Sequence, residues 1–93
     1  MASNQELRRV RFCCRVATNA PVYVAGTFNG WDPRRDRLWQ GPFSEGIHTT
    51  YLMLEPGRYE YKFVSGTDWF ADPDNPETVD DGFGSVNSVL RVS

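Results

Sequence analysis

The sequence has few of the residues that build disulfide frameworks, metal centres or nucleophilic catalytic sites. It contains two cysteines, one histidine and one lysine in 93 residues. The cysteines, Cys13 and Cys14, are adjacent, so their Cα atoms lie about 3.8 Å apart, which is shorter than ordinary disulfides allow. We therefore expect two free thiols, as in a reducing compartment. With His48 as the single histidine and no second cysteine pair, we expect no metal and no cofactor.

Long apolar runs are also absent, and so is the charged and apolar pattern that opens a secretory signal. We therefore expect no membrane association and a cytoplasmic location, unless a leader has been removed. The net charge of −2, with twelve acidic against ten basic residues, does not give the dominant positive face that nucleic-acid binding requires. A chain of 93 residues predicts a single domain over 1–93. Residues 1–6 are expected to form a frayed start.

Catalytic patterns are weak, and we expect a protein that is not an enzyme. No G-x-S-x-G motif presents a serine, and His48, in a threonine-rich stretch, is expected at the surface. The acidic residues between Asp72 and Asp81 could in principle bind calcium or act as a glycosidase pair. The stretch lacks EF-hand spacing, its prolines prevent that wrap, and a small sandwich offers little cleft. We interpret it as a solvated loop.

Hydrophobic periodicity of two runs through almost the whole chain, and no stretch shows a helical period. Val10, Phe12, Cys14 and Val16 alternate with arginines and Cys13, which predicts a half-buried strand with an arginine outer face. Frequent turn residues separate the strands. The pattern predicts an all-β fold, an immunoglobulin-like β-sandwich of about seven short antiparallel strands. These strands are expected at 9–16, 21–25, 38–43, 47–54, 58–64, 69–71 and 86–92, with loops at 27–37 and 72–85.

Two tryptophans lie in segments rich in turn residues, beside predicted strands. Trp31 lies within Phe28-Asn29-Gly30-Trp31-Asp32-Pro33, and Trp69 lies within Asp68-Trp69-Phe70-Ala71-Asp72-Pro73. Turn residues place the backbone at the surface, and an exposed indole suits the C–H face of a sugar ring. The alternative is that each tryptophan caps the core. Lys62, on the polar face of its strand, and Asn87, at the start of the last strand, could supply hydrogen bonds to sugar hydroxyls.

Ordered motifs over roughly residues 9–92 resemble the family 48 carbohydrate-binding modules. This group includes the glycogen-binding domain of the AMP-activated protein kinase beta subunit and the early-set domains at the N-terminus of isoamylases and branching enzymes. Four segments are similar to family motifs: Ala25-Gly26-Thr27-Phe28-Asn29-Gly30-Trp31, Leu54-Glu55-Pro56-Gly57-Arg58-Tyr59-Glu60-Tyr61-Lys62-Phe63, Asp68-Trp69-Phe70-Ala71-Asp72-Pro73 and Gly82-Phe83-Gly84-Ser85-Val86-Asn87-Ser88-Val89.

The resemblance implies an early-set sandwich that binds α-1,4-glucans such as glycogen, starch or maltooligosaccharides without catalysis. Trp31 and Trp69 would stack on glucose units, Lys62 and Asn87 would hydrogen-bond them, and Ser85 would be a lesser polar contact. Phe83 stands where the kinase subunit presents a leucine, and an aromatic ring there could be a third platform or could block the ligand. The alternative function is a structural or docking sandwich of an amylase-type enzyme or a regulatory complex. Possible protein partners are then a glycogen-metabolising enzyme or a kinase-type protein.

Overall fold

The computed structural model describes residues 6–43 and 45–93. The expected frayed start falls almost wholly on residues 1–5, which lie outside the described residues. The described part of the chain is all-β, as predicted, and contains no helix long and apolar enough to cross a membrane. Its eight strands are β1 (Arg8–Arg15), β2 (Val22–Gly26), β3 (Asp36–Gln40), β4 (Ile47–Leu54), β5 (Gly57–Ser65), β6 (Asp68–Phe70), β7 (Thr78–Asp80) and β8 (Val86–Val92).

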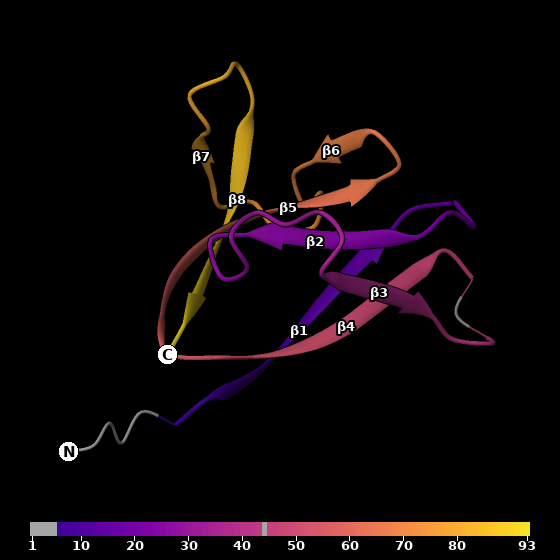
Figure 1. Ribbon diagram of the computed structural model, residues 1–93, viewed down its shortest axis with the longest axis horizontal. Coiled ribbons are helices and arrows are strands. Elements are labelled where there is room, and N and C mark those ends of the chain that lie inside the picture. The colour runs from indigo at the N-terminus through magenta and orange to yellow at the C-terminus, as the bar shows by residue number, and fades with distance from the viewer. Residues whose placement is uncertain (1–5, 44) are drawn as a thin grey trace.

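The strands form one antiparallel sheet that curls over itself into two layers (Figure 1). The order is β1-β4-β3-β2-β5-β8-β7, and β6 pairs with the C-terminal end of β5. Strand β3 connects the layers, because Leu38 pairs with Val22 of β2 while Trp39 pairs with Thr49 of β4. The predicted immunoglobulin-like sandwich is confirmed, with its two layers joined along β3.

The core lies between the two layers. Phe12 of β1 contacts Tyr61 of β5 with ring centroids 5.3 Å apart and an edge-to-face angle of 82°, although β1 and β5 are not neighbours in the sheet. Phe12 also lies 5.4 Å from the ring of Phe28. On β1, the period of two directs Phe12 inward and Arg9, Arg11 and Arg15 outward. Other core residues are Cys14, Val22, Val24, Leu38 and Phe63.

The two cysteines are free thiols on opposite faces of β1, as predicted. Cys13 is half-buried on the arginine face, and Cys14 is buried in the core. Burial, with a smaller contribution from the nearby Asp72 carboxylate, raises the pKa of the Cys14 thiol to about 12. Cys14 is therefore protonated at neutral pH and behaves as a small apolar side chain.

Three local expectations were wrong. His48 is 3% exposed, because its position in β4 points it inward opposite Cys14. Residues 78–80, expected within a loop, form β7, which pairs with β8. The third strand begins at Asp36 and ends at Gln40, so that Phe43 lies outside it and is 99% exposed.

Candidate functional site

The turn after β2 presents Trp31 on a buried polar scaffold. The Asn29 side chain is 8% exposed. Its Oδ1 accepts from the Gly26 N–H at 3.0 Å, and its Nδ2 donates to the Val24 carbonyl at 3.0 Å and to Asp36 Oδ2 at 2.7 Å. The Trp31 N–H donates to the Gly26 carbonyl at 2.9 Å. These bonds hold the tight turn in place.

Trp31 itself has a backbone conformation that few residues adopt. Its φ is 60°, the one positive value for a non-glycine residue in the described part of the chain. Left-handed backbone costs an L-residue roughly 1–2 kcal/mol. Such strain persists only where the surroundings determine it, and it is concentrated at functional sites. The strain therefore marks Trp31 as a residue whose orientation the fold enforces.

An open cavity of about 460 Å³ lies beside Trp31, on the outer face of the layer that contains β2, β5 and β8. Five of the six predicted site residues line it: Trp31, Lys62, Trp69, Phe83 and Asn87. Ser85 is exposed and is not among the lining residues. Three residues that the sequence pattern did not indicate complete the lining: Thr27, Glu60 and Asp81.

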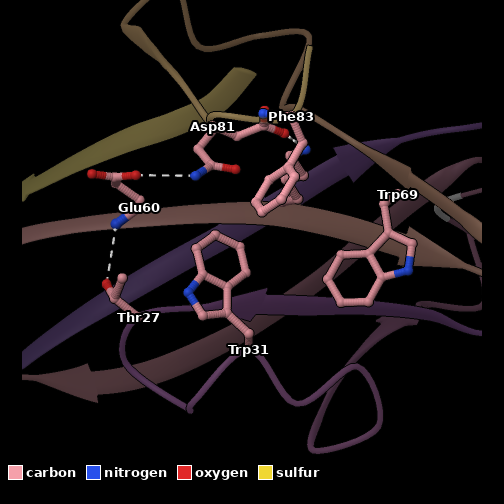
Figure 2. Close-up of a pocket in the computed structure, with 8 residues that line it drawn as sticks. Thr27, Trp31, Glu60, Trp69, Asp81 and Phe83 are labelled. Atoms are coloured by element: carbon pink, nitrogen blue, oxygen red, sulfur yellow. Dashed lines mark hydrogen bonds and ion pairs between the residues drawn. The ribbon is translucent and has the colours of Figure 1, made fainter. Parts of the chain in front are cut away.

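The aromatic side chains of the cavity come from three separate segments. Trp31 follows β2, Trp69 lies in the short strand β6, and Phe83 lies in the β7–β8 loop. Figure 2 shows the two indoles side by side, with Phe83 projecting toward them from the opposite side. Trp69 is 44% exposed and Phe83 is 93% exposed, while Trp31 is half-buried. Neither indole is fully buried in the core.

Lys62 and Asp81 form an ion pair in the cavity. Lys62 Nζ donates to Asp81 Oδ2 at 2.7 Å, and the two side chains are 12% and 11% exposed. Asp81 Oδ1 accepts from the backbone N–H groups of Phe83 and Ser85 at 2.7 and 3.1 Å. The Lys62 ammonium, followed by the Phe83 N–H, holds the pKa of Asp81 below its usual range. One carboxylate thus anchors both the lysine and the loop that presents Phe83.

Glu60 is the second carboxylate of the cavity. Its Oε1 accepts from Asn87 Nδ2 at 3.0 Å, and its Oε2 accepts from Arg58 at 2.9 Å. The Asn87 amide and then the Arg58 guanidinium lower the pKa of Glu60. Thr27 Oγ1 accepts the Glu60 N–H at 3.2 Å (Figure 2). Asn87 is therefore held by Glu60, with its own side-chain oxygen left as an acceptor.

The acidic stretch is only partly the solvated loop that we expected. Asp81 is half-buried in its ion pair with Lys62. Asp72 Oδ2 accepts from the Tyr61 hydroxyl at 2.7 Å, and the Asp72 N–H donates to Ser88 Oγ at 2.7 Å. Within residues 6–43 and 45–93, no group of three or more His, Cys, Asp or Glu side chains is placed to hold a metal ion.

The sequence contained a signal for one of the unpredicted cavity residues, Glu60, but none for Asp81. Glu60 lies two positions before Lys62, so on a strand it shares the face of the lysine. Asp81 could not be assigned in this way, because its contact with Lys62 crosses from the β7–β8 loop to β5. The arrangement places aromatic faces around an open cavity with fixed donors and acceptors between them, which is the general anatomy of a small-ligand site.

An all-strand sandwich with an open aromatic cavity is typical of a carbohydrate-binding module. The family described as the glycogen recognition site of AMP-activated protein kinase matches residues 14–93. The chain belongs to this family.

Curated relatives include three proteins in which this domain is one part. The chain is 30% identical to Protein PTST homolog 2, chloroplastic, of Arabidopsis thaliana over 98% of its own length and 16% of that protein. It is 40% identical to Protein PTST, chloroplastic, of the same plant over 76% of its length and 25% of that protein. It is 31% identical to 5'-AMP-activated protein kinase subunit beta-1 of Sus scrofa over 76% of its length and 53% of that protein.

Among solved structures, the fold is similar to part of the maltogenic amylase from S. marinus. The TM-score is 0.67 at 24% identity, covering 91% of this chain and 13% of the amylase chain. This likeness supports the early-set sandwich fold.

Proposed function

We propose that this chain is a non-catalytic module that binds α-1,4-glucans, such as glycogen, starch and maltooligosaccharides, across Trp31 and Trp69. The supporting observation is that both indoles and Lys62, from three different segments, line one open cavity. Membership of a glycogen-recognition family supports the choice of ligand class.

In the proposed complex, the indoles of Trp31 and Trp69 stack against the C–H faces of glucose units, and Phe83 supplies a third apolar face. Lys62 uses one of its three N–H groups for Asp81, which leaves the others for sugar hydroxyls or ring oxygens. Glu60, already ionised, accepts from hydroxyls. An open platform covers one side of the sugar, so the expected binding free energy is on the order of 4–8 kcal/mol, which corresponds to mM to μM affinity.

Isothermal titration with maltoheptaose tests this function in the wild type and in Trp31→Ala and Trp69→Ala. We expect each variant to lose most of the affinity, about tenfold or more, because each removes a stacking face. Trp39→Ala is the matched control, since Trp39 is 59% exposed and lies on β3 outside the cavity. Absence of heat at several-millimolar sugar, or an equal loss for Trp39→Ala, would contradict the proposal.

A docking role is the second candidate, and the outer face of β1, β3 and β4 favours it. Trp39, Tyr51 and Met53 are 59%, 48% and 55% exposed there. Arg37 lies 3.9 Å over the ring of Trp39, and Arg9 lies 4.0 Å over the ring of Tyr51. Exposed aromatic residues and arginines are enriched where proteins bind one another.

We propose a glucan-metabolising enzyme or a kinase-type protein as the partner for this face. The chain spans from about an eighth to about half of the length of these relatives and of the amylase. Such a partner is one way in which a small module acts in a larger assembly. Trp39→Ala should then weaken association with an α-glucan-active enzyme, measured by surface plasmon resonance, while glucan affinity stays unchanged.

A further inference from the structure

Trp69 separates two hollows on the same side of the molecule. Besides the cavity described above, it lines a second groove of about 360 Å³. The walls of the groove are mainly apolar and include Pro21, Tyr23, Pro33 and Val64, and Arg34 is its charged wall residue. Trp69 belongs to the lining of both, so a ligand that leaves the first cavity over this indole meets the second.

Strand register places the groove next to the first cavity. Tyr23 of β2 pairs with Val64 of β5, and Val64 pairs with Trp69 of β6. Lys62 and Val64 are two residues apart on β5, so they point to the same face of the sheet. The cross-strand row Tyr23, Val64 and Trp69 therefore continues the surface that begins with Lys62.

Resting on the proposed function, we propose that this groove is a second subsite for the same α-1,4-glucan chain. It would bind glucose units beyond those held between Trp31 and Trp69. The chain would bend over the rim formed by Trp69, which lines both hollows. Long glucans would then gain affinity from contacts that short glucans do not reach.

The groove carries the chemistry that a sugar requires. Tyr23 offers an aromatic ring with a hydroxyl, and the prolines and Val64 offer apolar walls. Within residues 6–43 and 45–93, the side chain of Arg34 has no hydrogen bond or ion pair. Its backbone N–H donates to Asp32 Oδ1 at 2.9 Å. A guanidinium has five N–H donors, so Arg34 can donate to several hydroxyls without breaking an existing contact.

Two variants test the groove without touching the first cavity. Arg34→Ala removes the donor, and Ala20→Trp fills the groove from an exposed position in its wall. Arg35→Ala is the matched control, because Arg35 is an exposed arginine that lines a different hollow near Phe28. Neither Ala20, Arg34 nor Arg35 is in the core, so folding is expected to be kept and is checked by the melting temperature.

The affinity of each protein for maltotriose and for maltoheptaose is measured by calorimetric titration. The NMR chemical shift of the Gly66 amide, which lies in the groove, reports directly on occupancy of the groove. We expect the wild type to prefer maltoheptaose, and Arg34→Ala and Ala20→Trp to reduce that preference about fivefold or more, with maltotriose affinity kept. Gly66 should shift with maltoheptaose. An unchanged preference in both variants overturns the second subsite, while the Trp31 and Trp69 site stands. Failure of the wild type to bind either sugar overturns the proposed function itself.

Discussion

The Lys62 ammonium has two possible partners, the Asp81 carboxylate and a ligand in the cavity. It pairs with Asp81 at 2.7 Å and also faces the cavity where we place the glucan. An ammonium can serve both, since it has three donors. The pair limits the motion of a flexible side chain before the ligand arrives, which lowers the entropy that binding must remove.

Lys62→Ala should therefore lower both glucan affinity and stability. We expect affinity to fall about tenfold or more, since a charged donor contributes roughly 1.5–3 kcal/mol. We expect the melting temperature to fall because Asp81 keeps an unpaired charge. Lys62→Arg should not fully restore binding, because a planar guanidinium differs from a compact ammonium. Titration calorimetry and thermal melts give the two readouts.

The double variant Lys62→Ala/Asp81→Asn separates these effects. The asparagine oxygen can still accept the N–H groups of Phe83 and Ser85, but it carries no charge. We expect the double variant to regain part of the melting temperature and none of the affinity. Equal affinity for the wild type and Lys62→Ala would instead remove Lys62 from the binding site.

Asn29 is the second residue whose role is visible only in the folded chain. Its side chain makes three buried or partly buried hydrogen bonds to Gly26, Val24 and Asp36. Asn29→Ala should cost about 2–4 kcal/mol of unfolding free energy, since it leaves these groups without a partner. Asn19→Ala, at an exposed position, should change stability by no more than about 0.5 kcal/mol. Urea unfolding of both variants checks the difference.

At the scale of elements, the β7–β8 hairpin acts as a separate support for Phe83. Asp81 fixes its loop through the N–H groups of Phe83 and Ser85, and Asp80 accepts the Gly82 N–H at 2.7 Å. The loop therefore has an ordered backbone although Phe83 is 93% exposed. An apolar ring in this position is available to a ligand before binding.

Phe83→Ala should weaken glucan binding by roughly 0.5–1.5 kcal/mol, the value of an aromatic contact beyond its area. It should leave the melting temperature nearly unchanged, because the ring buries little surface. Phe83→Leu should recover part of the affinity. A rise in affinity for Phe83→Ala would show that the ring blocks the site, which is the alternative that the sequence left open. Calorimetric titration of the three proteins distinguishes the outcomes.

At the scale of the whole molecule, three paired carboxylates predict how stability depends on pH. Hydrogen bonds from Asn87, Arg91 and Lys62 are the first causes that lower the pKa values of Glu60, Glu77 and Asp81. A carboxyl group whose pKa is lower in the folded state binds protons more readily when unfolded. Its contribution is complete above the unfolded value near pH 4 and is lost as pH falls through the folded value.

We therefore expect a melting temperature that is nearly constant above about pH 5 and that falls steadily below about pH 4. Asp81→Asn should make this acid decline shallower, because one of the linked groups no longer titrates. Glu77→Gln should have a smaller effect, since its pair with Arg91 is largely exposed and such pairs contribute little. A decline equally steep in Asp81→Asn would contradict this assignment.

Much of the fold was predictable because short-range rules act on neighbours in the chain. Alternation of apolar and polar residues identified β1, β4 and β5, and turn residues marked where strands end. The prolines, glycines and asparagines around Trp31 and Trp69 indicated that neither indole lies within a central strand. Strand β7 was missed because three residues in a polar stretch carry no clear period, and its existence depends on pairing with β8.

The sequence by itself determined the all-β character of the chain, the two free thiols and the family, and it named five residues that line one cavity. Tertiary structure alone decided the burial of His48, the Lys62–Asp81 ion pair and the groove beyond Trp69. Local periodicity predicts on which face of its own strand a side chain lies. Which segments meet on that face depends on register between strands and on the curl of the sheet, and both are set by packing of the whole core.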